Sequence, residues 1–357
     1  MRNHAMDRKA FEQEILRHLK TEKQDHPAMK QQDAVKFVFQ AMLGPGHLLS
    51  SRTAAEEYIT QETEQLSAGA EEPLCESLSP AWCRLSLRSA KERNITPPVI
   101  AGLMFASGSG PRFTRQDVFS FCKRLAGSEE KLITDQDALD RIMDETWLPS
   151  HSPVYRDQYH PAYRVISAGW IPCMKAIGRI AGQCGERVLV TIDGPCASGK
   201  TTLAGKLAEV FGAAVVHTDD YVIPHAQKTA ERLAVPGGNC DADRLAAEVT
   251  APWKRGDPVI YRRYDCRNDV LLPEERLPDC RVLILEGSYC GLPAIRRYAD
   301  VRIFVNASME TRERRLRQRE SAHSLQMFYD RWIPLEDAYF AAYRLPDDGC
   351  IVIGGQE

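Results

Sequence analysis

The densest group of residues able to act chemically lies just past the middle of the chain. It fits the pattern G-x-x-x-x-G-K-[ST] and consists of Gly194, Pro195, Cys196, Ala197, Ser198, Gly199, Lys200, Thr201 and Thr202. The apolar run 188–192 before it predicts a buried strand, and 203–208 after it predicts the start of a helix. Backbone N–H groups of such a loop surround a polyphosphate, Lys200 reaches its β and γ phosphates, and the Thr201 hydroxyl can ligate Mg²⁺. We therefore expect a site for ATP and Mg²⁺; a glycine-containing turn that matches by accident is the alternative.

Two adjacent carboxylates follow the second predicted strand, 213–217. Asp219 and Asp220 stand where the chain leaves the sheet, near the expected position of the γ-phosphate. Transfer of a phosphoryl group to a hydroxyl needs a carboxylate that accepts the hydroxyl proton. We predict that Asp219 is this base. The alternative is that these aspartates form a turn or cap a helix, and this alternative has more weight for Asp220 than for Asp219.

A third strand, 282–285, ends in the carboxylate of Glu286. In a protein with a phosphate loop, such a strand end lies beside the loop. Glu286 is therefore predicted to hold Mg²⁺ or one of its waters, with an ordinary surface role as the alternative.

An arginine-rich stretch after the fourth strand predicts a helix with one cationic face. Arg312, Arg315 and Arg319 share that face by their spacing. Guanidinium groups stabilise a phosphoryl group in transfer because they donate two hydrogen bonds at once. The alternative is a solvated charged face on which Glu313 and Glu320 are the partners.

Polar and aromatic residues between the second and third strands are candidates for an acceptor pocket. They include Asn239, Asp241 and Tyr264. Aromatic rings could stack on a base there while polar groups contact its edge. A solvated loop explains the same residues equally well.

From 186 to 357 the chain resembles the uridine kinase and phosphoribulokinase branch of the P-loop kinases. The resemblance is carried by the phosphate loop and by Asp219-Asp220-Tyr221, Asn239, Asp241, Tyr264-Asp265, Leu285-Glu286-Gly287 and Arg319-Glu320. It implies that Asp219 is the base and that Arg315 and Arg319 belong to a lid over the phosphates. It also implies substrate contacts from Asn239, Asp241 and Tyr264, to which we add the two neighbours of the base, Asp220 and Tyr221.

Two features depart from uridine kinases. The second basic cluster of the lid has no counterpart in 320–324, and Arg267-Asn268 replace the histidine expected after the pocket tyrosine. Uridine is therefore not assigned as the acceptor. The opening Ile192-Asp193-Gly194-Pro195 also resembles cytidylate kinase, but the acceptor-binding elements of that family are absent downstream.

Hydrophobic patterning divides the chain into two domains. Apolar strand candidates at 188–192, 213–217, 282–285, 301–305 and 350–353 alternate with helical stretches, which predicts a doubly wound parallel α/β sheet. We expect a P-loop kinase domain over 187–357. A mainly α-helical module over 1–165 and a connecting segment over 166–186 precede it. Helical periodicity in the module covers 11–19, 35–42, 114–125 and 135–147.

The helical module has a dense polar cluster at 151–164 and a second candidate turn at 44–47. Its histidines His47, His151 and His160 could bind a metal or an anion. Hydrogen-bonded loop residues are the favoured interpretation, because no metal-ligand spacing is present.

Composition excludes several classes of protein. The 357 residues carry a net charge of −3, and 43% are hydrophobic, which gives no general attraction to nucleic acid or anionic membranes. The eleven cysteines include no C-x-x-C pair, and the first 20 residues are charged throughout, unlike a secretory signal peptide. No apolar run approaches the roughly 20 residues that span a membrane. We therefore expect a cytoplasmic protein. We expect an ATP-dependent phosphotransferase that acts on the hydroxyl of a nucleoside or other small metabolite. A nucleoside monophosphate kinase and a regulatory NTP-binding switch are the alternatives.

Overall fold

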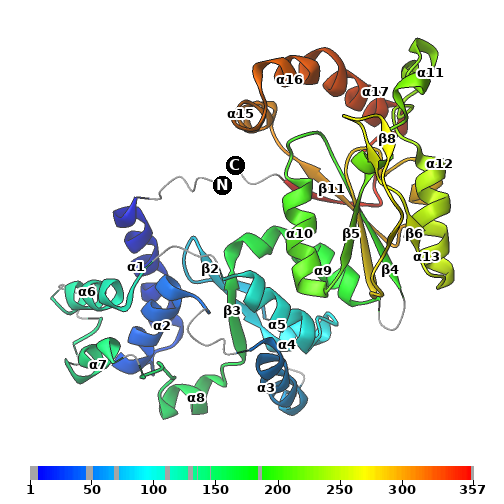
Figure 1. The fold of residues 1–357 in the computed structure, drawn as a ribbon. Coiled ribbons are helices and arrows are strands. Elements are labelled where there is room, and N and C mark those ends of the chain that lie inside the picture. Colours follow the sequence, from blue (N-terminus) through cyan, green and yellow to red (C-terminus); the bar gives the residue numbers. More distant parts are fainter. Residues whose placement is uncertain are drawn as a thin grey trace. The chain divides into compact units, whose positions relative to one another are not determined.

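The computed structural model describes residues 7–45, 51–67, 72–108, 113–127, 132–134, 136–144, 146–183 and 187–354. The chain forms two compact units, Met1–Ile171 and Pro172–Glu357 (Figure 1). His47 and the glycine turn expected at 185–186 lie outside the described residues.

A five-stranded parallel sheet is the centre of the C-terminal unit. Its strand order is β12-β11-β4-β10-β5. The bounds are β4 (Val188–Asp193), β5 (Ala214–His217), β10 (Val282–Glu286), β11 (Val301–Asn306) and β12 (Cys350–Gly354). All five predicted strands are confirmed. Strands β4 and β10 are buried at every residue, as their continuous apolar sequences require.

Helices cover both faces of this sheet, so the doubly wound class is confirmed (Figure 1). On one side lie α9 (Met174–Ala181), against β11, and α10 (Lys200–Phe211), against β4, β5 and β10. On the other lie α12 (Ala242–Leu245) and α13 (Ala251–Arg255). Here Leu245, Val249 and Trp253 share a core cluster with Leu283 and Leu285 of β10.

Three further helices of this unit lie near the carboxyl ends of the strands (Figure 1). They are α15 (Met309–Arg319), α16 (Ala322–Met327) and α17 (Ile333–Tyr343). Ser308 caps α15 by accepting a hydrogen bond from the backbone N–H of Thr311, so the arginine-rich stretch is helical as predicted.

The N-terminal unit is mainly helical, as expected. Its helices are α1 (Arg8–Asp25), α2 (Gln31–Leu43), α3 (Arg52–Gln65), α4 (Leu87–Glu92), α5 (Pro97–Ala106), α6 (Arg115–Ala126), α7 (Gln136–Asp140) and α8 (Pro153–Tyr159). Thr114 and Asp117 form a capping box at the start of α6. The helix predicted over 135–147 is shorter, because α7 ends at Asp140 and a 3₁₀ turn follows it.

A three-stranded antiparallel sheet in this unit was not anticipated. It consists of β1 (Cys75–Ser77), β2 (Trp82–Ser86) and β3 (Tyr163–Ser167) in that order. Strand β2 is buried at every residue, including Arg84, so its sequence lacks the alternation that reveals a half-exposed strand. The expected connection 166–186 contains the end of β3 and all of α9. Among the described residues, no helix is both long and apolar enough to cross a membrane.

Candidate active site

The glycine-rich loop joins β4 to α10 and has the backbone shape of a phosphate cradle. Gly194, Ala197 and Gly199 have positive φ values of 138°, 59° and 110°. A Cβ atom on Gly194 would lie 2.2 Å from the carbonyl oxygen of Val305, so this position accepts only glycine. Such left-handed positions turn successive N–H groups towards one concave side, where they bind anions.

Two side chains of the loop fit a polyphosphate. The Lys200 ammonium is buried and donates hydrogen bonds to the carbonyl oxygens of Gly194 (2.8 Å) and Pro195 (3.0 Å). The Ser198 hydroxyl is buried and has no hydrogen-bond partner among the described residues. A buried polar atom without a partner is costly, and a phosphate oxygen in the cradle would satisfy it.

Strand register brings the predicted metal ligands together. Glu286, the last residue of β10, pairs with Ile192 of β4 and with His217 of β5. The Thr201 hydroxyl donates a hydrogen bond of 3.1 Å to Glu286 Oε1, and His217 Nδ1 lies 2.5 Å from the same oxygen. That hydrogen bond raises the pKa of His217. One hydroxyl and one carboxylate are oxygen ligands of the kind that hold Mg²⁺ together with a nucleotide's phosphates, so these residues fit the metal.

Asp219 lies in a 3₁₀ turn, Thr218–Tyr221, directly after β5. The turn is anchored by the Thr218 hydroxyl, which donates to the carbonyl oxygen of Ser288 at 2.8 Å. The Asp219 carboxylate reaches solvent and accepts no hydrogen bond from the described part of the chain. Desolvation by the surrounding site raises its pKa; the carboxylates of Glu286 and Glu336 add to the rise, and Lys200 opposes it. Asp219 is thus a free carboxylate close to the loop lysine and to the candidate metal ligand.

Two buried carboxylates fix the loop in place, and sequence reasoning missed both. Asp193 accepts hydrogen bonds from the backbone N–H of Gly194 (2.7 Å), the N–H of Gly291 (2.8 Å) and the Tyr339 hydroxyl (2.6 Å). Burial raises the pKa of Asp193 to about 6. Glu336 of α17 accepts a 2.8 Å hydrogen bond from the backbone N–H of Cys196. Glu336 lies 140 positions along the chain from Cys196, so no local motif could have identified it.

The three arginines of the predicted cationic face have different surroundings. Arg312 is buried, donates to the carbonyl oxygen of Cys196 (2.9 Å) and lies 3.7 Å from Glu336. Arg315 donates to the carbonyl oxygens of Ala197 (3.0 Å) and Ser198 (2.9 Å). Arg319 is exposed and pairs with Glu320 at 2.7 Å, the arrangement of a solvated face. Arg312 and Arg315 therefore hold the phosphate loop from outside.

Most of the predicted acceptor residues already have partners. Tyr221 is fully buried beneath the Arg244 guanidinium, 4.1 Å from its ring centre, and donates to Glu248 at 3.2 Å. Asp241 caps α12, and the Tyr264 hydroxyl donates to Asp269.

Two of the predicted acceptor residues keep polar groups available. Asn239 is buried, and its Oδ1 has no hydrogen-bond partner among the described residues. Asp220 is half-buried, and desolvation raises its pKa.

The histidines proposed for the N-terminal unit do not gather into a metal centre. His151 contacts Asp33 and Tyr163, and His160 ends α8 on the surface. In the described part of the chain, no group of three or more His, Cys, Asp or Glu side chains is arranged to hold a metal ion.

No protein-family model matches the chain. Two similar proteins are a cytidylate kinase of Acidiphilium cryptum (strain JF-5) and the bifunctional alpha-galactosidase/sucrose kinase AgaSK of Mediterraneibacter gnavus. The first is 28% identical over 154 residues, which cover 40% of this chain and 72% of that protein. The second is 30% identical over 188 residues, which cover 46% of this chain but only 20% of AgaSK.

Similar solved structures include a putative fructose transport system kinase from Silicibacter sp. TM1040 and a possible uridine kinase from Bacillus stearothermophilus. The first is 25% identical and covers 50% of this chain and 96% of its own, with a TM-score of 0.40. The second is 21% identical and covers 50% and 99%, with a TM-score of 0.37. The resemblance to P-loop kinases predicted from the motifs is confirmed by the two similar proteins, both of which are named as kinases. The acceptors in the names of these proteins and structures differ from one another.

Proposed function

We propose that the unit Pro172–Glu357 is an ATP- and Mg²⁺-dependent phosphotransferase that acts on a hydroxyl group of a nucleoside or another small metabolite. One observation carries the proposal: the phosphate loop, the Thr201–Glu286 pair and the free carboxylate of Asp219 meet at the ends of three adjacent parallel strands. Ligands of open α/β sheets bind at this edge. Similarity to several kinases supports the same class of reaction.

The proposed reaction assigns a separate task to each group. Asp219 accepts the proton of the acceptor hydroxyl while that oxygen bonds to the γ-phosphorus of ATP. The bond from the γ-phosphorus to the bridging oxygen breaks, and ADP leaves. Desolvation strengthens Asp219 as a base, because a raised pKa means a higher proton affinity. Lys200 and the loop N–H groups offset negative charge, and bound Mg²⁺, held by Thr201 and Glu286, would neutralise the phosphates.

Acceptor-dependent ADP release tests this proposal. The full chain is supplied with MgATP and, one at a time, with nucleosides, nucleoside monophosphates and sugars. We expect ADP release to rise with one class of acceptor and the product to carry one additional phosphate. ADP release that ignores every acceptor would contradict a kinase and favour the NTP-binding switch.

A nucleoside monophosphate kinase is the second candidate. The similarity to a cytidylate kinase favours it, as does the opening Ile192-Asp193-Gly194-Pro195. The same panel separates the two candidates: a nucleoside diphosphate as product identifies this one, because its acceptor is a phosphate oxygen rather than a hydroxyl.

A further inference from the structure

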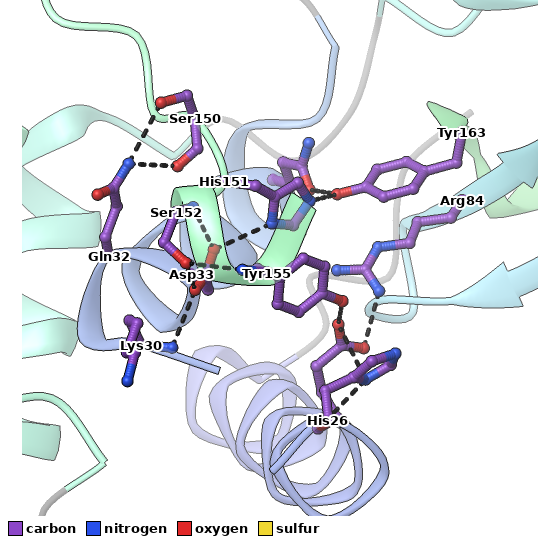
Figure 2. Close-up of polar contacts among 12 residues, drawn as sticks. His26, Lys30, Gln32, Asp33, Arg84, Ser150, His151, Ser152, Tyr155 and Tyr163 are labelled. Carbon is purple, nitrogen blue, oxygen red and sulfur yellow. Dashed lines mark hydrogen bonds and ion pairs between the residues drawn. The ribbon is translucent and has the colours of Figure 1, made fainter. Parts of the chain in front are cut away.

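A polar cluster inside the N-terminal unit is explained by its own contacts (Figure 2). Asp33 accepts hydrogen bonds from the Ser152 N–H and the Ser152 hydroxyl, both at 2.7 Å. Glu22 accepts from the Arg84 guanidinium at 2.7 Å and from the Tyr155 hydroxyl at 2.6 Å. These contacts join α1, α2, β2 and α8, so the cluster holds that unit together. A network of the same kind lies in the C-terminal unit, where it reaches the candidate base.

The 3₁₀ turn after β5 determines where the candidate base lies. Asp219 accepts no hydrogen bond from the described part of the chain, so its carboxylate is placed by the backbone that carries it. The first anchor of this turn is the Thr218 hydroxyl, which donates to the carbonyl oxygen of Ser288. The second is Arg244, whose Nη2 donates to the carbonyl oxygen of Asp220 at 3.2 Å. The position of the base therefore depends on both anchors.

The Arg244 guanidinium also contacts the aromatic residue of this turn. It lies 4.1 Å from the centre of the buried Tyr221 ring, a favourable distance between a cation and a ring face. Glu248 accepts hydrogen bonds of 3.2 Å from both the Tyr221 hydroxyl and Arg244 Nη1. Arg244 thus holds the turn through its backbone and through its ring, and Glu248 fixes the orientation of both side chains.

The same guanidinium reaches two other segments, in which acceptor residues are predicted. Its Nη1 donates at 2.8 Å to the carbonyl oxygen of Arg262, which precedes β7 (Tyr264–Asp265). Its Nε lies 3.5 Å from Asp241 Oδ2, in the segment that also contains Asn239. A planar guanidinium offers donors in several fixed directions, which a lysine does not. One side chain therefore links the turn of the base to both segments.

The charge of Arg244 is balanced by two carboxylates that water can reach. Its ion-pair partners Asp241 and Glu248 have side chains that are 32% and 27% exposed. If the guanidinium is removed, water can solvate both carboxylates, and ion pairs that water reaches contribute little to stability. Loss of Arg244 should therefore disturb the geometry of the site more than the stability of the fold.

We propose that Arg244 is a positioning residue of the phosphotransferase, which keeps the turn of Asp219 at a fixed distance from the segments that bind the acceptor. The inference rests on the proposed function, in which Asp219 accepts the proton of the acceptor hydroxyl. Arg244 acts through the Asp220 carbonyl and the Tyr221 ring rather than on the phosphoryl group. A misplacement of about 1 Å in a catalytic group can lower the rate about 10²-fold, so such a support matters to turnover.

Steady-state kinetics of Arg244→Met test this inference, with MgATP and the acceptor that most raises ADP release by the wild type in the panel above. We expect kcat to fall about 10- to 100-fold, because the base no longer meets the hydroxyl at the right distance. KM for the acceptor should rise severalfold. KM for ATP should stay within about twofold, since the phosphate loop keeps its own contacts. Arg255→Met, at an exposed arginine of α13, is the matched control and should keep all three values.

Two further measurements separate positioning from stability. Arg244→Lys keeps the charge beside Asp241 and Glu248 but not the planar set of donors, so kcat should fall about three- to tenfold with Tm nearly unchanged. Hydrogen exchange, followed by mass spectrometry, needs no acceptor. Amides of 218–223 should exchange about tenfold faster in Arg244→Met than in the wild type or Arg255→Met, the effect of losing a hydrogen bond from a charged group.

The outcomes distinguish this inference from the proposed function. A wild-type kcat in Arg244→Met overturns the inference and leaves the kinase assignment intact, as does a lower Tm with an unchanged kcat. If Arg244→Met does not fold, Arg244→Lys decides, and a wild-type kcat there overturns the inference. A wild-type chain that releases no ADP in response to any acceptor overturns the proposed function and this inference with it.

Discussion

Asp219 and Glu286 are both carboxylates at strand ends, yet their surroundings predict different defects. Asp219 accepts no hydrogen bond from the described chain, whereas Glu286 accepts from Thr201 and contacts His217. Asp219→Asn should lower kcat by about 10²- to 10⁴-fold, the usual weight of a general base, with little change in ATP affinity. Glu286→Gln should instead raise the Mg²⁺ concentration needed for half-maximal rate. Steady-state kinetics over a series of Mg²⁺ concentrations distinguish the two variants. If both variants only needed more Mg²⁺ and kept the wild-type kcat, Asp219 would be reassigned as a metal ligand.

Lys200 illustrates a residue whose importance should be catalytic rather than structural. Within the described part of the chain, the hydrogen bonds of its ammonium go to two loop carbonyls, so Lys200→Ala should leave the thermal melting profile nearly unchanged. Turnover should be lost, because the charge acts on the transferring phosphoryl group. Lys206→Ala, an exposed lysine in the same helix, is the control and should keep wild-type turnover. Normal turnover in Lys200→Ala would remove the loop from the mechanism.

Lys36 leads to a prediction about pH and stability. Its pKa is lowered from 10.5 to about 7 in the folded protein, so between these values the unfolded chain binds more protons. Stability must then increase as pH rises from about 7 towards 10. Lys36→Met should remove this part of the pH dependence and raise Tm at pH 7. Lys9→Met, at an exposed lysine of α1, is the control and should do neither. Thermal melts at pH 7 and pH 9 measure both effects. A lower Tm for Lys36→Met at pH 7 would mean that folding does not disfavour the charged form of Lys36.

At the scale of elements, α17 supports the phosphate loop directly through Glu336 and, by way of Asp193, through Tyr339. Glu336 accepts from the Cys196 N–H and lies near the buried Arg312, so Glu336→Ala leaves a donor and a cation without their partner. We expect a loss of about 1–3 kcal/mol in unfolding free energy, measured by urea denaturation. Glu274→Ala, an exposed glutamate, should lose almost nothing. Equal stability of the two variants would mean that Glu336 does not hold the loop.

Hydrophobic patterns in the sequence predicted the parallel sheet of the C-terminal unit but not the antiparallel sheet of the N-terminal unit. Continuous apolar runs predicted the five parallel strands because such strands are buried on both faces. Strand β2 is equally buried, but Arg84 at its centre is of a residue type that is typical of the surface, so its sequence is not a continuous apolar run. Local spacing likewise identified Lys200 and Thr201, while Asp193 and Glu336 act through contacts that exist only after the chain folds. Tertiary partners, rather than motifs, decide those roles.

At the scale of the whole molecule, the division at Pro172 predicts an independently folding kinase unit. Every residue of the candidate active site lies between Asp193 and Glu336, and this unit has its own apolar core. Helix α9 belongs to it: Ile177 and Ile180 are buried, and the helix packs against β11. A fragment that begins at Pro172 should therefore unfold cooperatively and bind ATP within about twofold of the full chain, because a unit with its own core can fold by itself.

A shorter fragment that begins at Arg187 provides the matched comparison. It keeps every predicted site residue but lacks α9, so apolar surface of the sheet that α9 covers becomes exposed to water. We expect its Tm to fall well below that of the Pro172 fragment, measured by circular dichroism, with ATP binding surviving only where the fragment stays folded. Equal stability of the two fragments would show that α9 is a connection rather than part of the core. Failure of the Pro172 fragment to fold would show that the two units of the chain depend on one another.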